Sequence, residues 1–93
     1  MADETCRASL EIVNRLGLHA RAAVLLVQAA TRFDATVAVT KDGQTVDGRS
    51  IMGVMMLAAE QGSRIEVETT GPQARAALDA IAELVANRFN ESD

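Results

Sequence analysis

His19 and Arg21 are the two residues whose types and spacing most directly suggest chemistry. His19 is the only histidine among the 93 residues, and Arg21 follows it by two positions. A neutral imidazole is a good nucleophile near neutral pH, since the pKa of an unperturbed histidine side chain is about 6.5. A guanidinium adds a fixed, charge-assisted donor for an anion. The pair is therefore suited to accepting a phosphoryl group.

The backbone next to His19 is expected to assist such an anion. Residues 20–33 contain no Gly or Pro and are rich in Ala, Leu and Val, which predicts a helix. His19 then stands at the helix start, where unpaired N–H groups and the helix dipole favour a phosphate. A local cap or an ordinary surface histidine would occupy the same position, and composition does not decide between these interpretations.

The segments around this helix predict the first elements of the fold. Residues 7–14 alternate, with Ala8, Leu10 and Ile12 on one side, as in a half-buried strand. Gly17 gives the following turn its backbone freedom, and Leu16 and Leu18 are expected to anchor it. One apolar stripe runs along the helix through Ala23, Leu26, Val27, Ala30 and Phe33.

Three further strands and a final helix follow in the sequence. Residues 35–40 and 44–47 predict two strands joined by a tight reversal at Asp42-Gly43. Residues 64–69 predict the fourth strand, and Gly71-Pro72 opens a helix. Its core face carries Leu78, Ile81, Val85 and Phe89. The two ends, residues 1–5 and 90–93, are expected to be loose.

A second motif begins at Ser50, which is expected to cap a short helix running to about residues 61–62. Val54 and Leu57 can seal the core. Three other apolar residues are then hard to bury on so short an element, and they suit a surface that engages several proteins in turn. These residues are Ile51, Met52 and Met55. The alternative is that the methionines fill gaps in the core.

The element order predicts one domain over residues 1–93, of the α+β class, built as an open-faced β-sandwich in the order βαββαβα. Nine basic and 13 acidic side chains give a net charge of −4, which argues against a general nucleic-acid binder. A lone Cys6 allows neither an internal disulfide nor a thiol metal site. The chain has no apolar signal segment and no spanning run, so we expect a cytoplasmic protein that does not enter the membrane.

The run around His19 resembles the active-site signature of the HPr family, the phosphohistidine carriers of the bacterial phosphoenolpyruvate-dependent phosphotransferase system. That run is Gly17-Leu18-His19-Ala20-Arg21-Ala22-Ala23. The resemblance extends over nearly the whole chain and implies four antiparallel strands covered on one face by three helices. Family members usually carry Pro where this chain has Ala22. We expect the helix to survive this change, with a loss of roughly 0.4–1 kcal/mol of chain stiffening.

The resemblance also implies a function as a carrier rather than an enzyme. His19 would accept phosphate from enzyme I on its imidazole nitrogen nearer the backbone and pass it to a histidine of an enzyme IIA domain. Arg21 and the helix start would hold the phosphate, without a cofactor or metal. Ala20, Ile51, Met52 and Met55 are the candidate partner-binding residues. A small apolar patch suits brief encounters, and we expect a monomer.

Ser50 supports an alternative function. Residues 49–55 resemble the regulatory site of HPr proteins controlled by an ATP-dependent HPr kinase/phosphorylase, so the chain could be an interaction module read through Ser50 phosphorylation. Residues 66–73, with Phe89, instead resemble NPr, the nitrogen-related branch of the family. Sugar uptake and purely regulatory signalling both remain open. A third possibility, a small nucleic-acid-binding domain, shares the element order but not the charge.

Overall fold

The computed structural model describes residues 3–92, and a four-stranded antiparallel sheet is its central layer. The strands are β1 (Glu4–Glu11), β2 (Thr36–Lys41), β3 (Gln44–Asp47) and β4 (Arg64–Gly71). They lie in the order β1-β4-β2-β3, so the first and last strands of the chain are neighbours. This arrangement confirms the predicted fold class.

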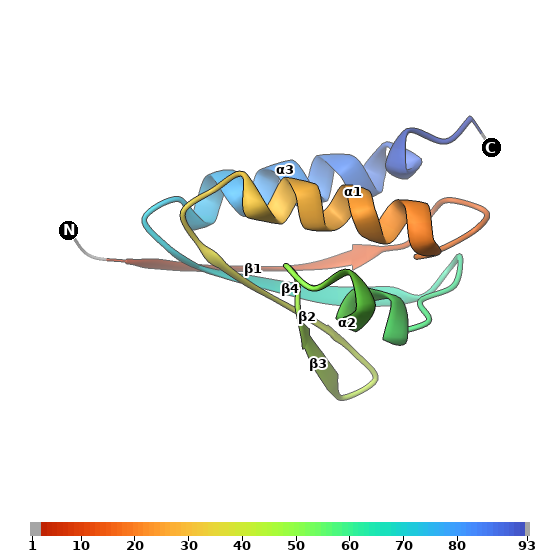
Figure 1. Cartoon of the computed structure of the whole chain (residues 1–93), viewed down its shortest axis with the longest axis horizontal. Coiled ribbons are helices and arrows are strands. Elements are labelled where there is room, and N and C mark those ends of the chain that lie inside the picture. The colour runs from red at the N-terminus through yellow and green to blue at the C-terminus, as the bar shows by residue number, and fades with distance from the viewer. Residues whose placement is uncertain (1–2, 93) are drawn as a thin grey trace.

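Three α-helices accompany the sheet, α1 (Ala20–Thr31), α2 (Ile51–Met56) and α3 (Ala74–Ala86). The two long helices pack against each other over one face of the sheet, and the shorter α2 lies beside α1 and β3 (Figure 1). One short turn, η1 (Arg88–Asn90), follows α3. In residues 3–92, no helix combines the length and the apolar character needed to cross a bilayer.

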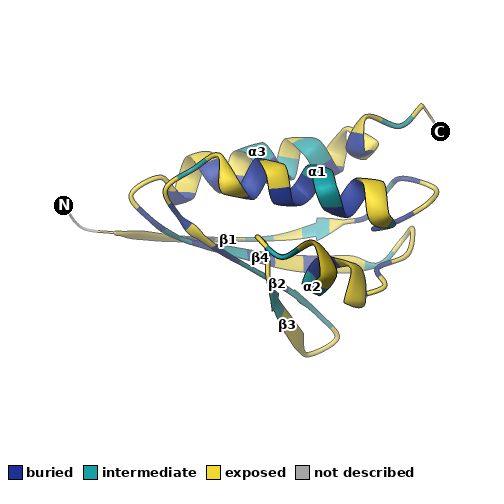
Figure 2. Ribbon diagram, in the orientation of Figure 1, coloured by how far each residue is buried: buried dark blue, intermediate teal, exposed yellow. Residues whose placement is uncertain are grey.

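The core lies between the sheet and the two long helices, as the buried stripes in Figure 2 show. On the sheet side, the predicted inward residues of β2 and β4 are buried, because alternate residues of a strand face the same side. Above them, the predicted apolar stripe of α1 is buried from Ala23 to Ala30, and that of α3 from Leu78 to Val85. The prediction that the last helix continues through Phe89 is wrong, because α3 ends at Ala86 and Phe89 is buried in the turn η1 that follows. The sheet residues concerned are Val37, Val39, Ile65 and Val67.

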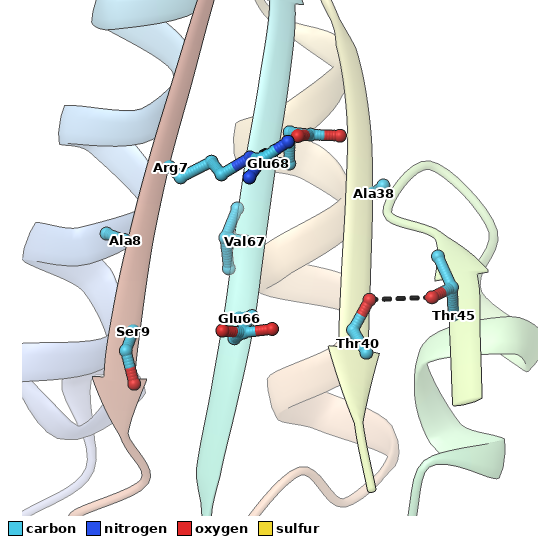
Figure 3. Close-up of a pocket in the computed structure, with 9 residues that line it drawn as sticks. All are labelled: Arg7, Ala8, Ser9, Ala38, Thr40, Thr45, Glu66, Val67 and Glu68. Atoms are coloured by element: carbon cyan, nitrogen blue, oxygen red, sulfur yellow. Dashed lines mark hydrogen bonds and ion pairs between the residues drawn. The ribbon is translucent and has the colours of Figure 1, made fainter. Parts of the chain in front are cut away.

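The opposite face of the sheet is open to solvent. Figure 3 shows a shallow hollow there, lined mainly by polar side chains of all four strands. Arg7 pairs with Glu68 across the β1/β4 ladder, and Thr40 and Thr45 share a hydrogen bond of 2.7 Å between their hydroxyl groups. Cross-strand polar pairs of this kind stabilise a solvated sheet face.

The predicted reversal between β2 and β3 is confirmed. Asp42 and Gly43 have φ angles of 51° and 81°, the two positive values that a two-residue hairpin turn of the mirror-image type requires. Such a turn matches the right-handed twist of the strands. The local Asp-Gly signal therefore determined this connection.

Two boundary predictions are wrong at the ends of β1 and α1. Glu4 and Thr5 are not a loose end, because they pair with Gly71 and Thr70 of β4. These partners lie beyond residue 69, where the apolar alternation of β4 predicted its end. Met1 and Ala2 lie outside the described residues. Because α1 ends at Thr31, Phe33 lies beyond the helix and is half-buried, with the guanidinium of Arg32 5.1 Å from the centre of its ring. The prediction of Phe33 as a core residue is therefore wrong.

The predicted end of α2 is also wrong. The helix stops at Met56 rather than near residues 61–62. Leu57 caps it, and Ala58 has a φ of 50°, which turns the chain out of the helical path. The carbonyl of Ala59 then accepts a hydrogen bond of 2.8 Å from the Leu18 N–H. A long-range contact to the loop before His19 therefore replaces the last helical turns.

Candidate functional site

The loop that carries His19 is fastened to the segment following α2. Ile12 exchanges backbone hydrogen bonds with Ser63 and Gly62, and Leu18 donates to Ala59. Gly17 has a φ of 67° and packs so closely that an added Cβ would lie 2.4 Å from the Ala59 carbonyl oxygen. Only glycine satisfies both conditions. The position of His19 is thus set by a tight approach of two loops.

Leu16 and Leu18 behave differently in this loop. Leu18 is buried, as predicted for an anchor, but the side chain of Leu16 is 64% exposed. The prediction that both leucines anchor the loop is wrong for Leu16. Both leucines line the depression next to His19, but Leu16 belongs to the exposed surface around that residue.

His19 is the N-cap residue of α1, as predicted. Its backbone is extended (φ −73°, ψ 179°), and the first helical hydrogen bond joins the Ala23 N–H to the His19 carbonyl at 2.9 Å. The preceding N–H groups, those of Ala20, Arg21 and Ala22, have no place in the helical ladder, and the dipole adds partial positive charge. Proline at Ala22 would therefore cost no helical bond, and α1 forms without it.

The side chain of His19 contacts a residue that the sequence did not indicate. Its Nε2 lies 2.6 Å from Oε2 of Glu91. The Nδ2 group of Asn14 donates to both oxygens of the same carboxylate, at 3.1 and 3.3 Å, and to the carbonyl of Gly17 at 2.9 Å. Asn14 is fully buried, whereas the His19 side chain remains 27% exposed. The prediction of a loose end over residues 90–93 is therefore wrong at Glu91; Asp93 lies outside the described residues.

The surroundings of Glu91 lower the pKa of its carboxyl group below the ordinary value of 4.5. The hydrogen bond with His19 is the largest cause of the lowered pKa, the bond from Asn14 acts in the same direction, and electrostatic interaction with His19 and Arg21 adds to both. Burial opposes them by raising the pKa. The lowering causes prevail, so Glu91 is a carboxylate at neutral pH.

Acid is expected to remove the stability that Glu91 contributes. Because its folded pKa is depressed, this contribution is fully present above the unfolded value of 4.5 and is lost as pH falls through the folded pKa. The free energy of unfolding of the wild type and of Glu91→Gln, measured by urea denaturation, should therefore converge as pH falls below 4.5. A difference that stays constant down to pH 2 would contradict this assignment.

Arg21 faces the same site from α1. Together with Arg15, Asn90 and Glu91 it lines a depression at the end of the molecule where α1 begins. His19 itself borders an adjoining depression formed by the loop and by residues 58–61. Arg15 borders both depressions, so two guanidinium groups, the imidazole and the start of α1 are grouped at this end of the molecule, beside the carboxylate of Glu91. The donors and positive charges of this group are suited to an anion.

The predicted residues of α2 divide between core and surface. Val54 and Leu57 are buried as predicted, and Ser50 caps the helix by accepting a 3.1 Å hydrogen bond from the Gly53 N–H. The remaining apolar side chains form one exposed cluster, the α2 patch, visible as the exposed ribbon of α2 in Figure 2. The patch consists of Ile51, Met52, Met55 and Met56, of which sequence reasoning missed Met56.

Ser50 does not line the depression next to His19. The helix α2 runs beside α1, and it is the segment after α2, not Ser50, that borders the depression of His19 (Figure 1). Ala20 is exposed beside His19. Within residues 3–92, no three His, Cys, Asp or Glu side chains are grouped so that they could hold a metal ion.

Known proteins match this chain along most of its length. The family model described as "PTS HPr component phosphorylation site" matches residues 6–87. The phosphocarrier protein HPr of Cupriavidus necator is 51% identical over 82 residues, which cover 88% of this chain and 92% of that protein. The HPr of Neisseria meningitidis is 46% identical over 87 residues, covering 94% and 98%.

The fold agrees with solved structures of the same proteins. The crystal structure of HPr-C-His from Thermoanaerobacter tengcongensis superposes with a TM-score of 0.91 at 36% sequence identity, covering 95% of this chain and 99% of that one. The residues matched by the family model include the His19 loop, Ser50 and nearly all of the sheet. The chain therefore belongs to the HPr family of phosphocarrier proteins of the phosphotransferase system.

Proposed function

We propose that His19 accepts a phosphoryl group from phosphorylated enzyme I and passes it to a histidine of an enzyme IIA domain. The observation that carries the proposal is the place of His19, which stands at the N-cap position of α1 with its imidazole partly exposed. The nitrogen nearer the backbone, Nδ1, has no hydrogen-bond partner among residues 3–92. It can therefore approach phosphorus without first breaking a bond.

The surrounding charges support this transfer. Phosphoryl transfer needs an in-line nucleophile and positive charge near the equatorial oxygens of the phosphoryl group. The free N–H groups at the start of α1 and the guanidinium of Arg21 would supply that charge. No protein-bound metal or cofactor is required for these roles. The chain would act as a carrier, since it forms and releases the same phosphohistidine.

The exposed α2 patch supports brief docking of both partners. Its four exposed apolar side chains form a small contact area, and small areas are typical of transient encounters. Methionines adapt to differently shaped surfaces, which suits a carrier that must bind a donor and an acceptor in turn. We propose this patch, with Ala20, as the partner-binding surface of a monomer.

His19→Ala is expected to abolish phosphate uptake. Phosphate incorporation from phosphoenolpyruvate, with and without enzyme I, would be followed by intact mass. We expect one acid-labile phosphate that depends on enzyme I and is lost in His19→Ala but retained in Ser50→Ala, which would also show that Ala22 is tolerated. Uptake by His19→Ala, or no enzyme I-dependent uptake by the wild type, would refute the proposal.

Ser50 supports a second, regulatory function. It is half-buried and immediately precedes Ile51 and Met52 of the α2 patch. A phosphate there would add a charge of about −1.5 to −2 next to a docking surface that is apolar. We propose that an HPr kinase/phosphorylase uses this position to block docking of enzyme I. The alternative function, an interaction module without relay activity, rests on the same residue.

Ser50→Asp is expected to slow phosphate uptake from enzyme I by roughly tenfold, because a buried unpaired charge opposes docking. Ser50→Asn is the matched control, since Asn and Asp cap helices about equally well and differ only in charge. Initial rates at limiting enzyme I would be compared. Equal rates for the two variants would contradict the regulatory function.

A further inference from the structure

The chain after α3 turns back toward His19 through an unusual segment. Arg88, Phe89 and Asn90 of η1 have φ angles of 57°, 51° and 62°, so three consecutive residues other than glycine adopt the left-handed conformation. Each such residue costs about 1–2 kcal/mol and persists only where its surroundings enforce it. The enforcing contact is the side chain of Phe89, which is completely buried.

Hydrogen bonds complete this turn. The N–H groups of Asn90 and Glu91 donate to the carbonyls of Asn87 and Arg88, both at 2.9 Å, and the Asn87 side chain donates to that of Asn90 at 2.7 Å. The result is that Glu91 meets a histidine 72 positions earlier in the chain. Strained backbone, a buried anchor and a long-range contact together indicate a built feature rather than a passing arrangement of the chain end.

The carboxylate of Glu91 is itself held in a fixed orientation. Asn14 donates one amide group to both of its oxygens while also binding Gly17, and Asn14 has no solvent exposure. The reversed amide would place its oxygen against a carboxylate and a carbonyl, which repel it, so the geometry favours only this orientation. Glu91 is thereby presented to Nε2 of His19 and not to Nδ1.

We propose that Glu91 is a positioning residue that keeps the proton of the neutral His19 imidazole on Nε2 and so leaves the lone pair of Nδ1 available to phosphorus. The proposal rests on the proposed function of His19 as the phosphoryl acceptor. A carboxylate has no proton to donate, so its short contact with Nε2 requires that the imidazole be the donor. Glu91, the hydrogen-bond partner of Nε2, therefore sets the tautomer of the His19 ring.

This tautomer lets the transfer proceed without a proton shift on His19. The Nδ1 lone pair forms the N–P bond, the bond between phosphorus and the donor histidine nitrogen of enzyme I breaks, and its electron pair stays with that nitrogen. The Nε2 proton remains in place throughout. The His19 ring gains positive charge as the bond forms, so its hydrogen bond to the carboxylate strengthens in the transition state and favours the transfer.

Glu91→Gln tests the proposal most sharply. An amide of the same shape can either accept a hydrogen bond from a protonated Nε2 or donate one to a bare Nε2, so it does not select a tautomer. It also lacks the charge that stabilises the phosphorylated ring. Glu91→Ala removes both properties, and Glu4→Gln is the matched control, since it deletes the same charge at the exposed far end of β1.

Two readouts are needed. Because the chain has one histidine, the imidazole ¹⁵N spectrum reports His19 alone. At a pH where the ring is neutral, we expect a bare Nδ1 and a protonated Nε2 in the wild type and Glu4→Gln. In Glu91→Gln and Glu91→Ala the two ¹⁵N shifts should move toward each other. In phosphate uptake, Glu91→Gln should lower the saturated rate with enzyme I roughly fivefold, with an unchanged KM.

The outcomes separate this proposal from the proposed function. Unchanged ¹⁵N shifts in Glu91→Gln, or a raised KM with an unchanged saturated rate, would overturn the positioning role while leaving His19 as the acceptor. Phosphate uptake by His19→Ala would instead refute the proposed function itself. Amide spectra and thermal unfolding verify that each variant is folded, and an unfolded Glu91→Gln would be replaced by Asn14→Asp, which repels the carboxylate of Glu91 and should shift the tautomer in the same direction.

Discussion

Phe89→Ala is expected to lower the free energy of unfolding by about 3–5 kcal/mol, the range for truncating a buried aromatic side chain. Phe89 heads the largest side chains with no solvent exposure, and it lies beyond the end of α3. A small domain has a total stability of about 5–15 kcal/mol, so this one change removes a large fraction of it. Urea denaturation at neutral pH would measure the loss.

Phe33→Ala is the matched control for this prediction, because it deletes the same atoms from a half-buried side chain. We expect a loss of about 1 kcal/mol, mainly from its contact with the Arg32 guanidinium. Loss of the Phe89 anchor should also free the left-handed turn and separate Glu91 from His19. Equal losses for the two variants, or an unchanged His19 ¹⁵N spectrum in Phe89→Ala, would contradict this role.

Gly17→Ala is expected to lower the free energy of unfolding by roughly 2–3 kcal/mol and to slow phosphate uptake. A left-handed conformation costs alanine about 1–2 kcal/mol. The new Cβ would also lie 2.4 Å from the Ala59 carbonyl oxygen, so the loops must separate and the Leu18 hydrogen bond of 2.8 Å must weaken. That bond contributes about 1 kcal/mol. His19 moves with the loop, which misplaces the nucleophile.

Gly43→Ala isolates the steric part of this effect. Gly43 also has a positive φ, 81°, but an added Cβ would meet nothing within 4 Å. Gly43→Ala should therefore lose only the energy that alanine needs to adopt a positive φ, and its rate of phosphate uptake should equal that of the wild type. Denaturation curves and initial rates for both variants would be compared with the wild type. If Gly17→Ala and Gly43→Ala lost equal stability, the close approach of Gly17 to Ala59 would have no energetic importance.

The elements whose signals are local were predictable. Alternation in β2 and β4, the helical stripes of α1 and α3, and the Asp-Gly reversal each depend on residues within a few positions of one another. Their order implied an α+β sandwich, and the structure has it. The same reasoning located His19 at a helix start and Ser50 at a cap, since both positions depend on the residues directly after them in the chain.

Other features depended on contacts between distant segments. The end of α2 was mispredicted because the Ala59 carbonyl is drawn to Leu18, a competition that no helical propensity reveals. The position of Leu16 depended on how Gly17 turns against that same segment. Glu91 was not predictable as a partner of His19, because a left-handed turn of three residues other than glycine has no sequence signature.

The amino-acid sequence alone determined the chemistry that is possible here, a histidine nucleophile and an arginine at the start of a helix, because residue type and helical periodicity are local properties. Only the tertiary structure decided which groups contact that histidine. The carboxylate of Glu91 and the amide of Asn14 reach His19 from the end of the chain and from the loop after β1. Burial of Phe89 holds them together, and burial is a property of the whole fold.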